Sequence, residues 1–258
     1  MTRGALPGGL VTFMFSDVCE STRLIQAIGD GYLPMLMEYR RILRSVLPSG
    51  GGIEMSVEAD AGYFVFVDAT AGLLACASAQ RMFSTGPWPS EVARPSVRIG
   101  LNTGFADPVD GEYVSAEVHR AARVAGLAGA GQVLCTAATA RAARLPAAQG
   151  RFVDIGLHHL RGFARNERLY ALTWSGSETP RSTARPRSRP AGKTLTRAES
   201  EVARLVTEGL SNTRIAQRLY LSRFTVESHL KHIFAKLGVS SRAEMTAVLI
   251  RRQMVDDV

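Results

Sequence analysis

The sequence predicts an α+β domain over residues 9–174 followed by a small all-α domain over residues 195–258. Three observations predict this division. Short β-like runs alternate with helical stretches in the first range, and helical periodicity alone marks the second. The segment between them has no large apolar side chain. A chain of 258 residues is also long enough for two domains.

The first domain is expected to open with a strand, a long helix and a hairpin. Val11–Phe15 is a short apolar strand. Helical spacing follows from about Glu20 to Leu47, where Pro48 and the glycine run 50–52 end it. The hairpin pairs Ile53–Val57 with Tyr63–Phe66, with Ala59–Gly62 at its tip.

The rest of this domain continues the alternation. The order of elements favours one mainly antiparallel sheet with helices on its faces. The expected elements are helices over Thr70–Phe83, Ala116–Leu127 and Ala137–Leu145, and strands over Val97–Thr103, Gln132–Cys135, Phe152–Leu157 and Arg168–Thr173.

Residues 175–194 form the expected linker. They read SGSETPRSTARPRSRPAGKT, with five basic residues. Such a Pro/Arg-rich composition cannot build a packed core, so we expect a flexible and partly extended segment. We favour a solvated tether, and contact of its arginines with phosphates is the alternative.

The second domain reads as four short helices with a tight turn between the second and the third. Thr196–Glu199 and Ser241–Glu244 are capping boxes that mark helix starts. The first helix ends at Gly209, the second starts near Ser211, and Ser222 caps the third, which ends at Gly238. The expected buried positions are Val202, Leu205, Val206, Ile215, Ala216, Leu219, Val226, Leu230, Ile233 and Leu237.

This arrangement is a helix-turn-helix, which presents one helix to a DNA major groove. The runs LTRAESEV, EGLSN and TVESHLKHIFAKL resemble, in order and spacing, the DNA-binding domain of LuxR-type transcription regulators over about Leu195–Ile250. The resemblance implies double-stranded DNA as the partner. It also implies that Glu227, Ser228 and Lys231 face the groove and that Thr225 touches the backbone. A four-helix bundle that binds protein is the alternative. The apparent exposed face of the third helix also includes His232 and Lys236.

The distribution of charge agrees with a polyanionic partner. Residues 175–258 hold fifteen Lys/Arg and eight Asp/Glu, a net charge of +7 of the chain's +8. Residues 1–174 carry the remaining +1. A localised basic region attracts DNA and makes its binding depend on salt.

A second resemblance covers residues 9–173. The runs VTFMFSDVCESTRL, GGIEMSVEADAGYFVF, VRIGLNTG, DGEYVSAEVHRAARVAGLAGAGQVLCT and DIGLHHLRGFARNERLYAL resemble, in colinear order, the catalytic domain of class III adenylate/guanylate cyclases. The resemblance implies a ferredoxin-like fold and ATP or another nucleotide as ligand. It also implies a head-to-tail homodimer in which both subunits build each site.

The resemblance assigns roles to three residues. Asp17, just after the first strand, and Asp60, at the hairpin tip, match the two carboxylates that hold the metal ions of these enzymes. Carboxylate oxygens suit Mg²⁺ or Mn²⁺, and two such ions assist phosphoryl chemistry. Arg123 matches the arginine that meets the charge of the transferring phosphoryl group.

Other positions depart from the pattern of the cyclases. His119 replaces the asparagine that orients the ribose, and Ser56 and Glu112 occupy the two base-selecting positions. Glu20 and Ala59 stand where glycines are usual, and a glycine lets backbone amides approach phosphates. These departures predict a partly degenerate nucleotide site.

Three functions remain open. The first is a DNA-binding regulator whose cyclase-like domain dimerises and senses a nucleotide. The second is an adenylate cyclase, weak or degenerate, with a DNA-binding tail. The third is an inert dimer scaffold. The scattered Cys19, Cys76 and Cys135 form neither a metal-ligand spacing nor a disulfide framework. No long apolar run is present, so we expect a cytoplasmic protein without a membrane partner.

Overall fold

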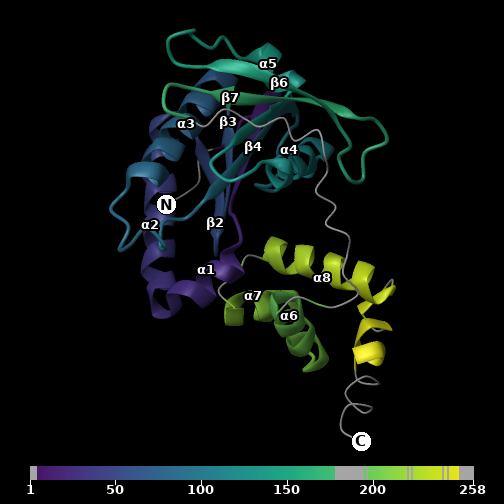
Figure 1. Cartoon of the computed structure of the whole chain (residues 1–258). Helices are drawn as coiled ribbons and strands as arrows, with labels where there is room; N and C mark the ends of the chain where they lie inside the picture. The colour runs from purple at the N-terminus through teal and green to yellow at the C-terminus, as the bar shows by residue number, and fades with distance from the viewer. Residues whose placement is uncertain are drawn as a thin grey trace, which may run out of the picture. The chain divides into compact units, whose positions relative to one another are not determined.

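The computed structural model describes residues 5–177, 195, 197–219, 221, 223–239, 241–242 and 244–249. The side chains at 197, 198, 223, 224, 228, 231, 232 and 235 also lie outside the described part. The chain divides into two compact units, one that holds the sheet and one that holds the C-terminal helices (Figure 1).

The N-terminal unit is built on a seven-stranded sheet of order β2-β3-β1-β4-β5-β7-β6. Every neighbouring pair is antiparallel except β4 and β5. This confirms the predicted mainly antiparallel sheet. The strands are β1 Leu10–Val18, β2 Ile53–Glu58, β3 Ala61–Phe66, β4 Val97–Phe105, β5 Val133–Thr136, β6 Arg151–His158 and β7 Glu167–Thr173.

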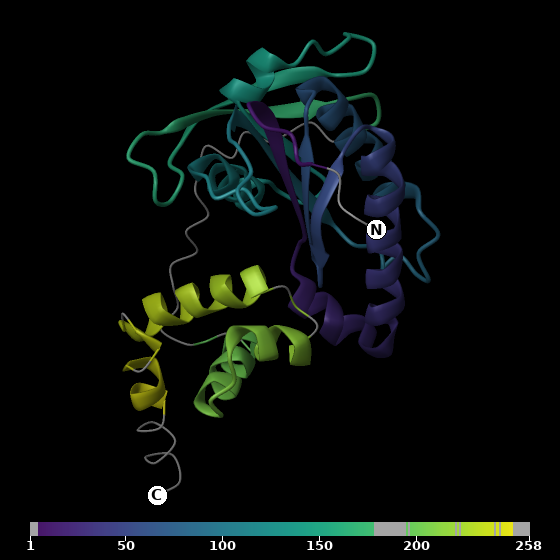
Figure 2. The ribbon, with the colours of Figure 1, turned by 180° about the vertical axis from the view of Figure 1, so that it is seen from behind.

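Helices cover both faces of this sheet. Figures 1 and 2 show α2 and α3 along one face and α4 against the other. Strand β1 lies inside the sheet, between β3 and β4, and is buried along most of its length, which explains its largely apolar sequence. The helices are α1 Ser21–Ile28, the 3₁₀ turn η1 Gly29–Gly31, α2 Tyr32–Ser49, α3 Ala69–Thr85, α4 Ala116–Leu127 and α5 Ala137–Ala142.

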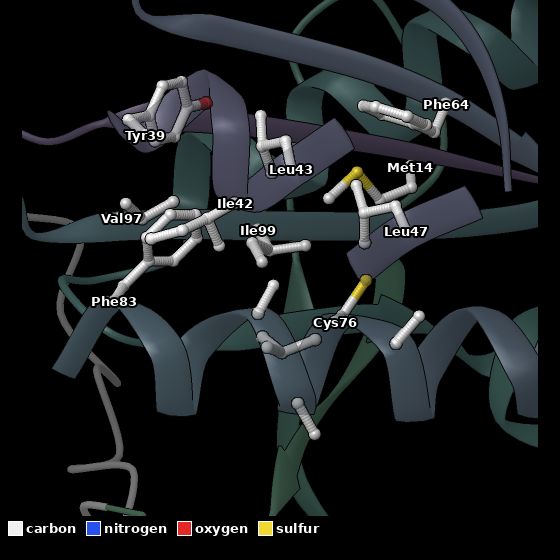
Figure 3. Packing of buried hydrophobic residues seen from close by; sticks show 14 of the residues in the cluster. Met14, Tyr39, Ile42, Leu43, Leu47, Phe64, Cys76, Phe83, Val97 and Ile99 are labelled. Carbon is white, nitrogen blue, oxygen red and sulfur yellow. The ribbon is translucent and has the colours of Figure 1, made fainter. Parts of the chain in front are cut away.

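The main core lies between the sheet and the helices α2 and α3. Figure 3 shows Tyr39 of α2 beside Phe83 of α3, and their rings stack at a centroid distance of 5.4 Å. The side chains of Met14 and Ile99, from β1 and β4, complete this layer and are fully buried. Burial of such side chains supplies most of the free energy that holds helices onto a sheet.

Two glycines of β4 let α4 approach the opposite face. A Cβ atom on Gly100 would lie 2.0 Å from the backbone nitrogen of Ala125, and one on Gly104 would lie 2.6 Å from Cγ of Glu117. A larger residue at position 100 would push the backbone of α4 away, and one at position 104 would displace the side chain of Glu117. The helix begins at the N-cap Ser115, whose hydroxyl accepts from the backbone N–H of Glu117.

Several expectations from the sequence need correction. Asp17 lies inside β1 and not after it, because β1 extends to Val18. The predicted long helix is interrupted at Gly29–Gly31, and Pro48 lies within its last turn. The hairpin turn is shorter than predicted, because Ala61 and Gly62 already belong to β3. Helix α5 ends at Ala142, before the predicted Leu145.

The C-terminal unit contains the predicted helices. They are α6 Arg197–Thr207, α7 Asn212–Leu219 and α8 Arg223–Leu237, with further helical residues at 242 and 244–249. The predicted apolar positions are buried except Leu219 and Leu237, which are half-buried. The hydroxyls of Ser211 and Ser241 accept from the backbone N–H groups of Arg214 and Glu244, as helix caps do. The predicted caps Thr196 and Ser222 lie outside the described residues.

In the part of the chain described here, no helix combines the length and the apolar character needed to span a bilayer.

Candidate functional sites

The sheet brings the two predicted metal carboxylates together. Asp17 on β1 pairs with Ala61 on β3, the residue that follows Asp60. The backbone N–H of Val18 donates to the carbonyl oxygen of Asp60 at 3.1 Å. Both aspartates are buried, and Asp60 has no exposed surface. Two carboxylates enclosed side by side repel each other unless a positive charge or a proton lies between them.

Arg98 supplies one positive charge, and the sequence alone did not single this residue out. Arg98 lies opposite Asp17 in the β1–β4 pair, and cross-strand partners share a face of the sheet. Its Nε donates to Asp17 Oδ2 at 3.0 Å, and its Nη2 donates to the same oxygen. A basic residue inside the strand-like run VRIGLNT was the only available signal.

The carboxyl of Asp17 remains incompletely compensated. Its pKa is raised from the usual 3.8 to about 7, chiefly by burial and then by the negative charge of Asp60, while Arg98 opposes the rise. The other oxygen, Oδ1, is buried and has no hydrogen-bond partner. A buried carboxylate oxygen without a partner fits a site for a hard cation.

A tyrosine hydroxyl beside this pair is also unpartnered. Tyr32, at the start of α2, is 3% exposed, and its hydroxyl oxygen is buried without a hydrogen bond. Burial raises the pKa of this hydroxyl well above its usual value, and the charges of Asp60 and Asp17 raise it further. The phenol therefore stays protonated and can donate a hydrogen bond to a carboxylate or to a water molecule bound to a cation.

The two positions that lack the usual glycine adopt left-handed backbone conformations. Glu20 has φ +51° and Ala59 has φ +47°. Glu20 follows β1 and precedes α1, and Ala59 precedes Asp60 in the hairpin turn. Residues other than glycine are disfavoured in this region. The backbone therefore has the shape that a glycine would favour, at a cost in free energy.

Arg123 and His119 lie on α4, one turn apart, so they share a side of the helix. His119 is exposed, and Arg123 is half-buried with its Nε buried and unpartnered. Asp17 makes its ion pair with Arg98 and not with Arg123.

A polar network fixes α4 on the sheet. Asn102 of β4 donates to Glu117 Oε2 at 2.7 Å, and Arg120 bridges Glu117 and Glu167 at 3.3 Å and 2.8 Å. The Arg120 guanidinium also lies 4.3 Å from the centre of the Phe163 ring. This network limits rotation of the helix that carries Arg123.

The two predicted base-selecting residues lie near one tyrosine. Ser56 of β2 is half-buried and lies opposite Tyr63 of β3. Burial raises the pKa of Tyr63 above its usual value, and Tyr113 and the charge of Glu112 add to the effect. The Tyr63 ring stacks on Phe15 at 4.5 Å, and its hydroxyl has no partner. The sequence offered no spacing that singled out Tyr63.

The predicted DNA-contacting residues belong to α8. Thr225 and Glu227 are half-buried, and the side chains of Ser228 and Lys231 lie outside the described part. The interpretation of Lys236 as a groove-facing residue is wrong. Its Nζ donates to Glu199 Oε2 at 2.6 Å, and the two side chains are only 14% and 7% exposed. Lys236 instead ties α8 to α6.

Comparison with known proteins defines the class of the C-terminal unit. Residues 193–249 match the family described as bacterial regulatory proteins, luxR family. A protein of Mycobacterium bovis named "Putative HTH-type transcriptional regulator" is 50% identical over 68 residues, which are 26% of this chain and 8% of that protein. The chain thus carries a LuxR-family helix-turn-helix domain.

The N-terminal unit has the fold of the class III adenylate/guanylate cyclases. An adenylate cyclase structure from Trypanosoma brucei superposes with a TM-score of 0.61 at 22% identity, over 68% of this chain and 96% of that one. An uncharacterized protein of Mycobacterium tuberculosis is 32% identical over 170 residues, or 64% of this chain. The chain spans about half of that relative, 56% of its length.

Proposed function

We propose that this protein is a DNA-binding transcription regulator whose N-terminal unit senses a divalent cation together with a purine nucleoside triphosphate. The observation that carries the proposal is the LuxR-family match, which covers α6, α7 and α8. The cyclase fold of the N-terminal unit supports the assignment of the sensing role to that unit.

DNA recognition is assigned to α8. Val226, Leu230 and Ile233 turn one side of this helix toward its own unit. Glu227, Ser228 and Lys231 then meet base edges, and Thr225 meets the phosphate backbone, as the resemblance implies. The net charge of +7 over residues 175–258 adds attraction that does not depend on DNA sequence.

Cation binding is assigned to Asp17 and Asp60. The buried Oδ1 atom of Asp17, which lacks a partner, supports this assignment. Bound Mg²⁺ or Mn²⁺ would offset the charge of a triphosphate. Ser56 and Glu112 are assigned to the purine edge, where neither matches the residues expected in an adenylate cyclase.

We assign the functional unit to a homodimer of this chain. In this arrangement Arg123 and His119 of one copy complete the site formed by the carboxylates of the other. The Nε atom of Arg123, which is buried without a hydrogen-bond partner, supports this arrangement. Pairing also brings two recognition helices to one DNA site, which raises the effective concentration of the second helix.

A slow adenylate cyclase is the second candidate. The retention of Asp17, Asp60 and Arg123 favours it. His119 weighs against it, because poor orientation of the reacting hydroxyl can forfeit much of the roughly 7–11 kcal/mol that positioning supplies. The strained turn at Ala59 weighs in the same direction.

A mobility-shift assay tests the proposed DNA contact. Lys231→Ala should weaken binding to the cognate operator by about 1–3 kcal/mol. Arg204→Ala is the matched control, because Arg204 of α6 forms ion pairs with Glu201 of the same helix and with Glu208 just after it. Equal affinities for the Lys231 variant and the parent would remove Lys231 from the DNA-reading residues.

Thermal unfolding with ATP or GTP and Mn²⁺, read together with cyclic nucleotide formation, separates the candidate functions. A rise in the melting temperature that Asp60→Asn abolishes, without product, supports the sensor. Product that Asp17→Ala abolishes supports the enzyme. DNA binding that ignores both nucleotide and Mn²⁺ supports the inert scaffold.

A further inference from the structure

The carboxylate of Asp17 already forms an ion pair within the protein, with the guanidinium of Arg98. Two nitrogens of Arg98 donate to the same oxygen, Oδ2. The side chains of Asp17 and Arg98 are 10% and 30% exposed, so water screens the pair poorly. In the absence of a cation, the guanidinium of Arg98 therefore lies against the carboxylate of Asp17.

The carboxylates of Asp17 and Asp60 can balance only a limited amount of positive charge. Asp17 and Asp60 are two buried carboxylates, and Arg98 forms an ion pair with Asp17. The Oδ1 atom of Asp17 is a buried acceptor without a hydrogen-bond partner. A divalent cation would offset both carboxylates by itself, and the adjacent guanidinium would then be an excess like charge that repels it.

We propose that Arg98 is a built-in counter-ion that competes with a divalent cation for Asp17, so that the cation binds only as the guanidinium leaves Oδ2. The inference rests on the proposed cation site. It assigns to Arg98 a role in setting the affinity of that site. Neither the resemblance to the cyclases nor the spacing of residues points to Arg98.

The opposite role for Arg98 predicts an opposite result. Hydrogen bonds from neighbouring side chains often orient a metal-binding carboxylate, and their loss commonly weakens metal binding 10–100-fold. If Arg98 acted in that way, its removal would weaken cation binding. If Arg98 competes, its removal strengthens binding. The sign of the change therefore distinguishes the two roles.

Electron paramagnetic resonance of free Mn²⁺ measures the affinity directly on the full chain. Arg98→Gln should bind Mn²⁺ at least about tenfold more tightly than the parent, because a nearby positive charge is gone. Arg98→Lys keeps the charge but loses the paired hydrogen bonds, and it should fall between the two. Arg168→Gln is the matched control and should bind like the parent, because it breaks the Arg168–Asp154 pair at the β6 edge.

Asp60→Asn separates failure of this inference from failure of the cation site. If Mn²⁺ binding depends on Asp60 but Arg98→Gln binds no more tightly than the parent, the competition is refuted and the site stands. If Asp60→Asn binds Mn²⁺ as the parent does, or the parent binds none, the proposed cation site is refuted and the competition falls with it.

A second measurement keeps the test valid if Arg98→Gln does not fold. In the parent protein, the Nε–H resonance of Arg98, assigned through Arg98→Lys, reports its hydrogen bond to Asp17. Mg²⁺ should shift this resonance toward the position of a solvated arginine. A resonance that stays in place while Mg²⁺ raises the melting temperature would refute the competition.

Discussion

At the scale of single residues, Asp17 combines burial, a like-charged neighbour and a basic partner. Its raised pKa means that the folded N-terminal unit binds a proton near neutral pH that the unfolded chain has already released. The stability contributed by this proton is complete below the unfolded pKa of 3.8 and is lost as pH rises through about 7.

The first prediction concerns pH. Between about pH 4 and pH 7, the parent should lose stability on the order of 3 kcal/mol, and Asp17→Asn should lose much less. Urea unfolding followed by tryptophan fluorescence measures this in the full chain, because Trp88 and Trp174 both lie in the N-terminal unit. Equal pH slopes for the two proteins would contradict the assignment of the proton to Asp17.

The residues of the candidate site were only partly predictable. The resemblance to the cyclases pointed to Asp17 and Asp60, and their role as metal ligands stays a prediction. The Asp17–Arg98 pair could not be predicted, because it depends on the register of β1 against β4. A shift of one residue would place Arg98 on the other face of the sheet.

At the scale of elements, the turn between β2 and β3 carries strain next to the candidate site. Ala59→Gly should stabilise the N-terminal unit by about 0.5–1 kcal/mol, because φ +47° costs glycine little. Ala61→Gly is the matched control within β3 and should destabilise by a similar amount. Urea unfolding at pH 8 measures both. A destabilised Ala59→Gly would show that the turn is not strained.

The pair of Lys236 and Glu199 predicts the behaviour of the C-terminal unit. Lys236→Met should destabilise it by about 3–5 kcal/mol, because the buried carboxylate of Glu199 loses its ion pair with Lys236. Adding Glu199→Leu should restore most of this loss. Hydrogen exchange in α6 and α8 measures the effect without relying on tryptophan. If hydrogen exchange in Lys236→Met is as slow as in the parent, the ion pair contributes little to stability.

The elements themselves were predicted with uneven success, for physical reasons. Helix α4 has the predicted bounds, because the side chain of Ser115 caps its start. The break at Gly29–Gly31 escaped prediction, because apolar spacing continues across it from Leu24 to Leu36. The spacing of apolar residues shows which face of a helix is buried, but it does not show where the helix is interrupted.

At the scale of the whole molecule, a basic linker and a basic helical unit follow an almost neutral domain. The sequence predicted the two fold classes, and the comparisons confirm both. The boundaries 9–174, 175–194 and 195–258 stay predictions. In the proposed homodimer, the residues of the shared site would come from two copies, and the pattern within one chain does not specify how the copies pair.

The linker prediction separates a tether from a DNA contact. Replacing Arg185, Arg187 and Arg189 with serine should leave the slope of log affinity against log salt unchanged if the linker is a solvated tether. Each lost phosphate contact would instead reduce the slope by about 0.9. Fluorescence anisotropy with a labelled operator, over a range of salt concentrations, measures the slope. A reduction near 2.7 would contradict the tether.

The burial of β1 on both faces has a consequence for how the protein could signal. A central strand held between two neighbours and two helical layers is among the last parts of a protein to open. Asp17 therefore lies on a rigid strand. In the proposed sensor, a bound ion would change the local charge at this strand while the backbone stays almost unmoved. The signal would then be a change of ionisation state and not a hinge motion.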